Sequence, residues 1–279
     1  SRQSSVAARA LRFEPLENRR LLAFGNAGIV TTDILATSSE WIESVALQAD
    51  GRIVAAGNVG LARYNADGSF DASFNASGSQ PGTIAAGDYQ HYFNDVALQA
   101  DGKVVAGGMK FGANDLDFLV SRYTAAGIPD ATFGVNGEVT VNFQGGGRGG
   151  HDRIEALAIQ PDGKIVAVGT ARNNWNVPQW VVMRFLPNGS LDTSFDSDGK
   201  LTTTFGKKTG AGAPEPNAVV LQPDGRILVA GSVHAATGNL NDTDFAVVRY
   251  NANGSLDQTF GQGGKLLTDF GSEFGQAFG

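Results

Sequence analysis

Four polar side chains occupy one position of an internal repeat, and their chemistry suits a cation. A glutamine marks the repeat, and the residue five places before each glutamine is Glu43, Asn94, Glu155 or Asn217. Carboxylate and amide oxygens in this mix are ligands that calcium takes in proteins. If the repeats surround an axis, the pattern predicts a calcium site formed by these four residues. The alternative is that each is a solvated polar start to a strand.

A second group of candidates lies in connections of unequal length between the repeated segments. Loops on a rigid scaffold commonly carry binding residues, and aromatic side chains commonly anchor such contacts. We therefore predict that a ligand contacts Trp41, Tyr89, His91, Tyr92, His151, Asp152, Trp175 and His234. The alternative is that these are isolated surface residues, which are common on any protein.

An enzymatic hypothesis combines both groups. In a calcium-dependent hydrolase or lyase, the four-residue ring would hold the metal, and His91 or His151 with Asp152 would act as general base. The sequence contains no triad signature, phosphate-binding glycine motif or zinc-ligand spacing, so we assign no catalytic residue.

The elements that must position these residues follow from the repeat itself. Its glutamines, Gln48, Gln99, Gln160 and Gln222, are 51, 61 and 62 residues apart, and each opens a Gln-x-Asp-Gly-Lys/Arg segment. The Asp-Gly pair predicts a two-residue hairpin turn with positive φ angles. In the third repeat, the predicted strands are 155–160, 164–169, 179–185 and 199–205. The second and third of these are apolar on both faces, which indicates a sheet buried between two other layers.

Four-stranded sheets packed face to face around an axis meet this requirement. We therefore predict an all-β fold, a β-propeller or partial propeller of four four-stranded antiparallel repeats. Residues 28–34 and 264–270 are predicted as outer strands at its two ends. Either these ends pair and close a small propeller, or the chain is a piece of a longer array.

Three further residue types recur once in every repeat. A partly buried arginine needs an acceptor, and an aspartate follows each arginine after eight residues, so the pairs predict ion pairs or turn clamps. The recurring phenylalanines are predicted to be core residues. The arginine, aspartate and phenylalanine positions are Arg63, Arg122, Arg184 and Arg249; Asp71, Asp130, Asp192 and Asp257; and Phe74, Phe133, Phe195 and Phe260.

Charge and composition exclude several classes of protein. The net charge is -7, and residues 1–22 hold five arginines against two glutamates, which leaves -10 for the remaining residues. So acidic a body disfavours nucleic-acid binding, and the lack of cysteine excludes disulfides and cysteine-based zinc sites. No apolar run is long enough to span a membrane. We expect residues 1–22 to be a basic, disordered leader and residues 23–279 to be one propeller domain.

The repeats resemble those of the delta-60 repeat family, an uncharacterised bacterial group assigned to β-propellers. The resemblance covers roughly residues 24–279 through Gln-x-Asp-Gly-Lys/Arg, the strand ending in Arg-Tyr/Phe, and Asn-Gly-Ser-Leu-Asp-x-x-Phe. It implies the fold and no catalytic motif. Residues 13–22 resemble the Leu-Glu-Pro-Arg-x-Leu-Leu type motif of exported bacterial proteins, with Asn18 where proline is usual; the alternative is a leader that merely precedes the domain.

Together these features predict a non-enzymatic β-propeller that is exported to the extracellular space or cell surface. It would act as a binding or structural module whose partner is a protein or a glycan. The calcium-dependent hydrolase or lyase is the alternative function.

Overall fold

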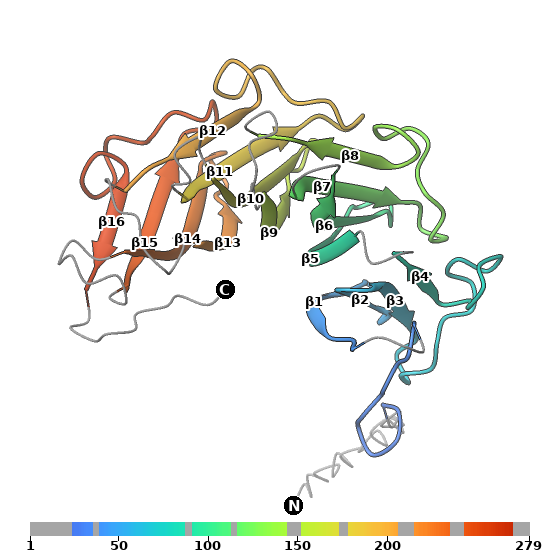
Figure 1. Ribbon diagram of the computed structural model, residues 1–279. Helices are drawn as coiled ribbons and strands as arrows, with labels where there is room; N and C mark the ends of the chain where they lie inside the picture. The colour runs from blue at the N-terminus through green and yellow to red at the C-terminus, as the bar shows by residue number, and fades with distance from the viewer. Residues whose placement is uncertain are drawn as a thin grey trace, which may run out of the picture.

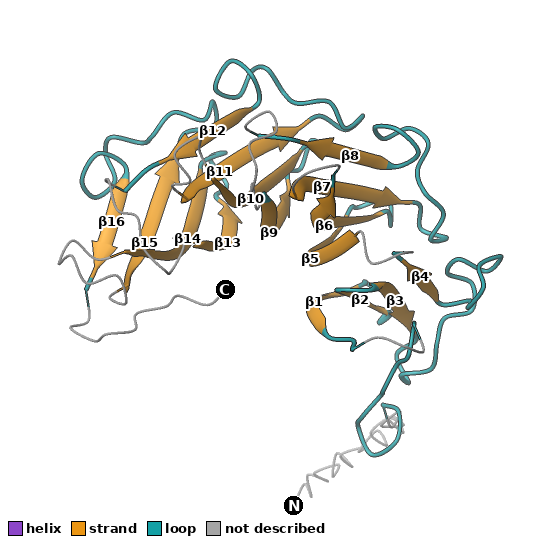
Figure 2. Cartoon of the chain, viewed as in Figure 1, coloured by secondary structure: helices purple, strands orange, loops and turns teal. Residues whose placement is uncertain are grey.

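The computed structural model describes residues 24–35, 39–86, 91–112, 116–143, 152–172, 178–205, 215–234 and 243–269. These residues form four sheets, each of four antiparallel strands in chain order without a crossover. We call the sheets blades 1 to 4. The predicted all-β fold of four four-stranded repeats is confirmed (Figure 2). Among the described residues, no helix is long and apolar enough to cross a membrane.

Each blade begins with its innermost strand. Blade 1 contains β1 (Ile42–Leu47), β2 (Ile53–Gly57), β3 (Gly60–Tyr64) and β4 (Thr83–Ala85). Blade 2 contains β5 (His91–Leu98), β6 (Val104–Phe111), β7 (Leu116–Tyr123) and β8 (Glu138–Val141). Blade 3 contains β9 (Arg153–Ile159), β10 (Ile165–Arg172), β11 (Pro178–Phe185) and β12 (Lys200–Thr203). Blade 4 contains β13 (Glu215–Leu221), β14 (Ile227–His234), β15 (Thr243–Tyr250) and β16 (Lys265–Thr268).

The blades follow one another around an open arc, with the innermost strands β1, β5, β9 and β13 on its concave side (Figure 1). Apolar residues fill the spaces between blades. We call the side of a blade that faces the next blade in the chain its forward face, and the opposite side its rear face. The forward face of blade 3 presents Val166, Trp180 and Val182 to Val229 and Tyr250 on the rear face of blade 4. The predicted burial of a sheet on both faces is found in blades 2 and 3, whose middle strands are covered by a neighbouring blade on each side.

The turn between the first two strands of each blade differs from the predicted two-residue turn. In blade 1, Gln48 N donates to Arg52 O and Gly51 N donates to Gln48 O, so the loop has three residues, 49–51. Only the glycine has positive φ, +85° in Gly51. This is a turn followed by a left-handed glycine, the other common way to join antiparallel strands. Asp50 instead accepts a hydrogen bond from Arg52 N.

The two predicted end strands have different outcomes. Residues 264–270 were predicted to form the outer strand of blade 4, and β16 confirms it. Residues 28–34 form no strand; a tight turn pairs Asn26 with Ile29 in an isolated bridge. β16 pairs only with β15, so within the described residues the two ends do not close a ring.

The repeated arginines form the predicted ion pairs. Arg122 Nε donates to Asp130 Oδ2 at 2.9 Å, and its guanidinium lies 4.6 Å from the centre of the Phe133 ring. The same geometry recurs at Arg63, Arg184 and Arg249. Phe74, Phe133 and Phe195 are fully buried core residues, as predicted. Phe260 is only half-buried.

Candidate functional site

Each innermost strand contains a β-bulge at the same place. The register slips by one residue between Ile42 and Ser44, between Phe93 and Asp95, and at the matching places of β9 and β13. The residues that the register skips are Glu43, Asn94, Glu155 and Asn217. A bulge re-aims a side chain and is frequent beside functional sites. The four residues predicted from their spacing therefore share one unusual backbone position.

A glycine on the second strand makes room for each bulge. A Cβ atom on Gly108 would lie 1.8 Å from the carbonyl oxygen of Tyr92, and one on Gly169 would lie 2.1 Å from that of Arg153. Gly57 and Gly231 have equivalent contacts. No side chain fits at these distances, so the repeated glycines and the bulges require each other.

The bulge residues of neighbouring blades come together near the axis of the arc. Asn94 Nδ2 donates to Ile154 O at 2.8 Å and lies 3.4 Å from Glu155 Oε2. Arg153 forms a salt bridge with Glu155 and donates from Nη2 to Glu215 Oε1 at 2.7 Å. Glu43 of blade 1 contributes to the electrostatic potential at both Arg153 and Glu155. We call Glu43, Asn94, Arg153, Glu155 and Glu215 the axial cluster.

Within the axial cluster, Glu155 has a strongly shifted pKa. Burial raises the pKa of Glu155 to about 7, and the nearby carboxylates of Glu215 and Glu43 favour the same direction. Arg153 opposes this rise. Glu155 therefore exchanges a proton near neutral pH, whereas an ordinary glutamate is ionised there.

The axial cluster does not have the donor arrangement of a calcium site. A cation, Arg153, already lies between Glu155 and Glu215, and Asn94 turns its amide nitrogen to the Ile154 carbonyl. Within the described ranges, no group of three or more histidine, aspartate and glutamate side chains could hold a metal ion. Calcium binding by Glu43, Asn94, Glu155 and Asn217 stays a prediction, and it would require Arg153 to move away.

Two of the predicted aromatic ligand-binding residues, Trp41 and Tyr92, lie at the same end of the blades as the axial cluster. Trp41 is 49% exposed, and its indole nitrogen donates a hydrogen bond to the Glu43 carboxylate. The rings of Tyr92 and Phe111 contact each other with centroids 6.1 Å apart. Trp41 therefore stands beside the axial cluster in a fixed orientation, with much of its surface free for a ligand.

His91 and Asp152 have separate partners. His91 Nδ1 lies 2.9 Å from Ala86 O, and its Nε2 lies 3.6 Å from Glu138 Oε1. Glu138 is also bonded to Lys110 Nζ at 2.9 Å. Asp152 is buried and accepts a hydrogen bond from Phe143 N at 3.0 Å. The carboxylate beside His91 is therefore Glu138, not the Asp152 of the predicted general base.

The remaining candidates cannot be placed in the site. Tyr89, His151 and Trp175 lie outside the described residues, and for His234 only the backbone, at the end of β14, is described. The predicted site residues did not include Arg153, Glu215 or Glu138. Arg153 and Glu215 each stand two residues before a bulge residue, and this spacing was the available signal.

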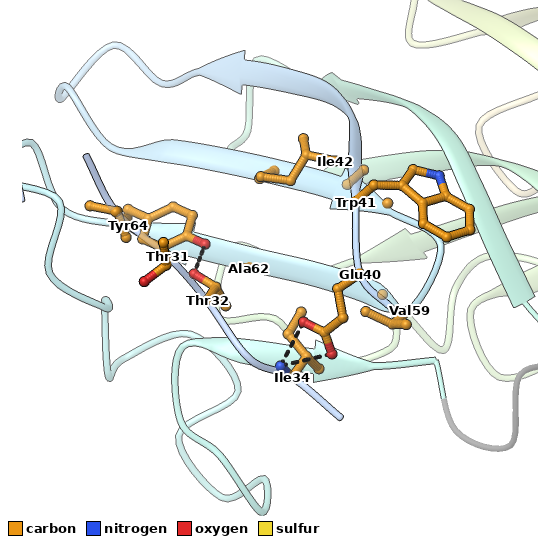
Figure 3. A pocket seen from close by; sticks show the side chains of 14 residues that line it. Thr31, Thr32, Ile34, Glu40, Trp41, Ile42, Val59, Ala62 and Tyr64 are labelled. Carbon is orange, nitrogen blue, oxygen red and sulfur yellow. Dashed lines mark hydrogen bonds between the residues drawn. The ribbon is translucent and has the colours of Figure 1, made fainter. Parts of the chain in front are cut away.

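A cavity of ≈ 290 Å³ lies on the rear face of blade 1, between residues 30–34 and the sheet (Figure 3). Its walls are mainly apolar, with Ala55, Ala62 and Tyr64 from the strands. The Glu40 carboxylate accepts hydrogen bonds from Ile34 N, at 2.9 and 3.0 Å to its two oxygens. The Glu40 carboxylate therefore fixes the backbone at Ile34 beside the cavity.

Comparison with known proteins supports the fold. Four segments, residues 48–74, 99–133, 160–195 and 222–260, match the family described as a domain of unknown function (DUF5122) beta-propeller. A search of curated proteins finds none that matches the chain.

Two solved structures are similar at low identity. A gluconolactonase from Xanthomonas campestris is 14% identical with a TM-score of 0.43, and the match covers 82% of this chain. A protein of unknown function from Bacteroides caccae is 15% identical with a TM-score of 0.41, and the match covers 77% of this chain. In each case the match spans 62% of the other chain's length.

Proposed function

Since its four repeats match the DUF5122 β-propeller family, we propose that this chain is a non-enzymatic, exported binding module, and that its ligand is a glycan held at the axial cluster. The carrying observation is the contrast between the two ends of the blades. At one end every blade repeats the same turn, with Asp-Gly or its equivalent. At the other end, the same bulge presents glutamate in blades 1 and 3 and asparagine in blades 2 and 4. Selection for structure alone explains the first end, and differing side chains on a fixed backbone suit recognition of a ligand.

The chemistry of that end favours a glycan over a protein. Sugar rings pack their C–H faces on exposed aromatic rings, and their hydroxyl groups bond to carboxylates and amides. Trp41 supplies an exposed ring that is bonded to Glu43, and Asn94 and Glu215 supply further polar groups of the axial cluster. The export of the chain is inferred from residues 13–22, which lie outside the described residues.

Binding to an array of bacterial and plant glycans, followed by titration calorimetry of the best ligand, tests this proposal. We expect Trp41→Ala to weaken binding by about tenfold or more, because an aromatic anchor contributes on the order of 2 kcal/mol. Ile128→Ala is the matched control, because Ile128 is 42% exposed but lies in a turn at the other end of blade 2. If Trp41→Ala left glycan binding unchanged, the ligand would bind elsewhere on the protein. If the chain bound a protein and no glycan, the partner would be a protein.

A calcium-dependent hydrolase or lyase is the second candidate, favoured by the pKa of Glu155 near 7. A carboxyl group that titrates near the working pH is suited to general acid–base catalysis. In this candidate Glu155 replaces the predicted pair of His91 or His151 with Asp152. Thermal unfolding after EDTA treatment, with calcium or magnesium added back, tests the metal. A calcium-specific rise in Tm that Glu43→Gln with Glu155→Gln abolishes would favour it, and no shift would count against it.

A further inference from the structure

Three junctions between blades are built from the same contacts. We call the arginine of each repeated Arg–Asp ion pair the clamp arginine. At each junction it donates from Nη1, at 2.6 Å, to a carbonyl of the following blade; these carbonyls belong to Ala125, Pro187 and Ala252. The next carbonyl of the same turn accepts a backbone N–H from the preceding blade, as Asn188 O does from Gly134 N at 2.9 Å. The junction is therefore a specific, repeated interface.

On the forward face of blade 4, no neighbour covers this interface within the described part of the chain. Arg249 bonds to Asp257 and Thr259, but the described residues contain no following turn for its Nη1. Its side chain is 21% exposed, against 3% for Arg122. Leu266 is 47% exposed, whereas Leu201, at the same position of blade 3, is 8% exposed. Val220 is 59% exposed on the same face.

The rear face of blade 1 also has apolar residues that are buried at the equivalent positions of the other blades but exposed here. Val45 is 63% exposed, and its equivalents Val96 and Leu157 are buried against the preceding blade. Ile42 and Leu47 on this face are 58% and 72% exposed. Most of the inner part of this face is therefore an uncovered apolar surface of the kind that marks an interaction site.

Residues 24–32 occupy only the outer part of that face. Their pattern Phe24-Gly25, then Gly28, then Thr32 repeats that of Phe260-Gly261, Gly264 and Thr268 in blade 4. Gly25 N donates to Asp67 O at 2.8 Å, which is the junction contact between backbones. The hydroxyl of Thr32 bonds to that of Tyr64 (Figure 3). Thr203 bonds to Tyr250 in the same way between blades 3 and 4. This segment therefore stands where the outer strand of a preceding blade would lie, and the cavity of Figure 3 lies beneath it.

We propose that the forward face of blade 4 docks on the rear face of blade 1 of a second copy of this chain, so that two copies form a head-to-tail dimer. The occupant is identified by chemistry already present in the chain. Ala66 O would accept from Arg249 Nη1 of the other copy, because Ala66 holds the turn position of Ala125 and Pro187. Asp67 O would accept from Gly261 N, and Tyr64 would bond to Thr268.

Docking displaces residues 24–32, and the exchange replaces their contacts one for one. Gly261 takes the place of Gly25, and Thr268 takes the place of Thr32. The arginine clamp and the burial of Val45, Leu47 and Val220 are then additional, and burial of apolar surface favours association. Because each copy offers both faces, two identical junctions close a cyclic dimer.

Sedimentation equilibrium of the full chain from micromolar to millimolar concentration tests the proposal. We expect a monomer–dimer equilibrium, weakened at least about tenfold by Val45→Lys or by Val220→Lys, because either lysine would be buried without a partner. Val135→Lys is the matched control, because Val135 is 76% exposed and lies on neither face. Circular dichroism of each variant verifies that the monomer is folded. A wild-type monomer at all concentrations would overturn the proposal, as would a dimer that neither lysine weakens.

A mixing experiment distinguishes head-to-tail docking from a symmetric contact. Val45→Lys and Val220→Lys chains should each be mainly monomeric, but an equimolar mixture should form heterodimers through the one junction that contains neither lysine. A mixture that stays monomeric, where the wild type dimerises, would exclude the head-to-tail junction. Gly25→Val adds a second variant, since a Cβ there would lie 2.3 Å from Ile29 O and loosen the displaced segment. It should tighten the dimer.

Discussion

Arg122 Nη1 donates a hydrogen bond of 2.6 Å to the carbonyl oxygen of Pro187, 65 residues further along the chain and in the next blade. The same guanidinium pairs with Asp130 in its own blade and lies over the ring of Phe133. One side chain therefore fixes the turn of its own blade and docks the next. The same contact to a following blade recurs at Arg63 and Arg184.

Replacing a clamp arginine should cost more in the middle of the array than at its end. We expect Arg122→Leu to lower the free energy of unfolding by about 3–5 kcal/mol, because a buried carboxylate loses its main partner. Arg249→Leu should cost about 1–2 kcal/mol, because that side chain is partly exposed and docks no following blade in the described residues. Urea unfolding followed by fluorescence measures both. Equal losses would show that the junction contact contributes little.

The glycine opposite each bulge should be intolerant of a side chain. Gly108→Ala places a Cβ 1.8 Å from the carbonyl of Tyr92, a backbone atom that cannot move without undoing the bulge. We expect a loss of about 4 kcal/mol or no folded protein. The neighbouring Gly107→Ala is the control, since its Cβ would meet the movable side chain of Leu157 at 2.9 Å. This substitution should cost about 1–3 kcal/mol. Similar stabilities of the two variants, measured by thermal unfolding, would contradict this account of the bulge.

Glu155 should make the folded protein less stable as the pH rises through neutrality. Its folded pKa, about 7, lies above the value of 4.5 for an ordinary glutamate. Between these values the folded state therefore binds more protons than the unfolded state. Stability therefore falls as the pH rises through this window. We expect the Tm of the wild type to fall more from about pH 5 to 8 than that of Glu155→Gln. Asp101→Asn, at an exposed carboxylate in the turn at the other end of blade 2, should follow the wild type. Parallel curves for all three proteins would disprove a raised pKa.

His91 should stabilise the fold mainly when it is protonated. The carboxylate of Glu138 raises the pKa of His91, burial opposes the rise, and the carbonyl of Ala86 adds to it. A raised folded pKa gives a contribution that is full below the ordinary value of 6.5 and is lost as the pH rises through the folded pKa. His91→Gln should therefore lower the Tm most near about pH 6 and least near about pH 9. If the Tm difference between the wild type and His91→Gln grew with pH instead, neutral His91 and not protonated His91 would be the stabilising form.

The sequence by itself determined the repeated, local features of this protein. The Gln-x-Asp-Gly segments indicated hairpins, the two-sided apolar strands indicated sheets covered on both faces, and the spacing of Arg122 and Asp130 indicated their ion pair. Such features could be predicted because each depends on residues close in the chain, and because four copies repeat the same physical solution. The positions of Glu43, Asn94, Glu155 and Asn217 were also found from this repetition.

Only the tertiary structure decided what those positions do. The bulge is a shift of one residue in the register between two strands, and we did not predict it from the sequence. It became evident from the pairing of the strands and from the close backbone contacts at Gly108 and Gly169. Arg153 reaches Glu215, 62 residues away, and His91 faces Glu138 instead of Asp152, because packing of blades and strands sets these distances. Residues 24–32 resemble an outer strand in sequence, but among the described residues they pair with no neighbouring strand, and they lie against blade 1. Local patterns specify strands and turns, whereas partners distant in the chain depend on how the completed blades pack.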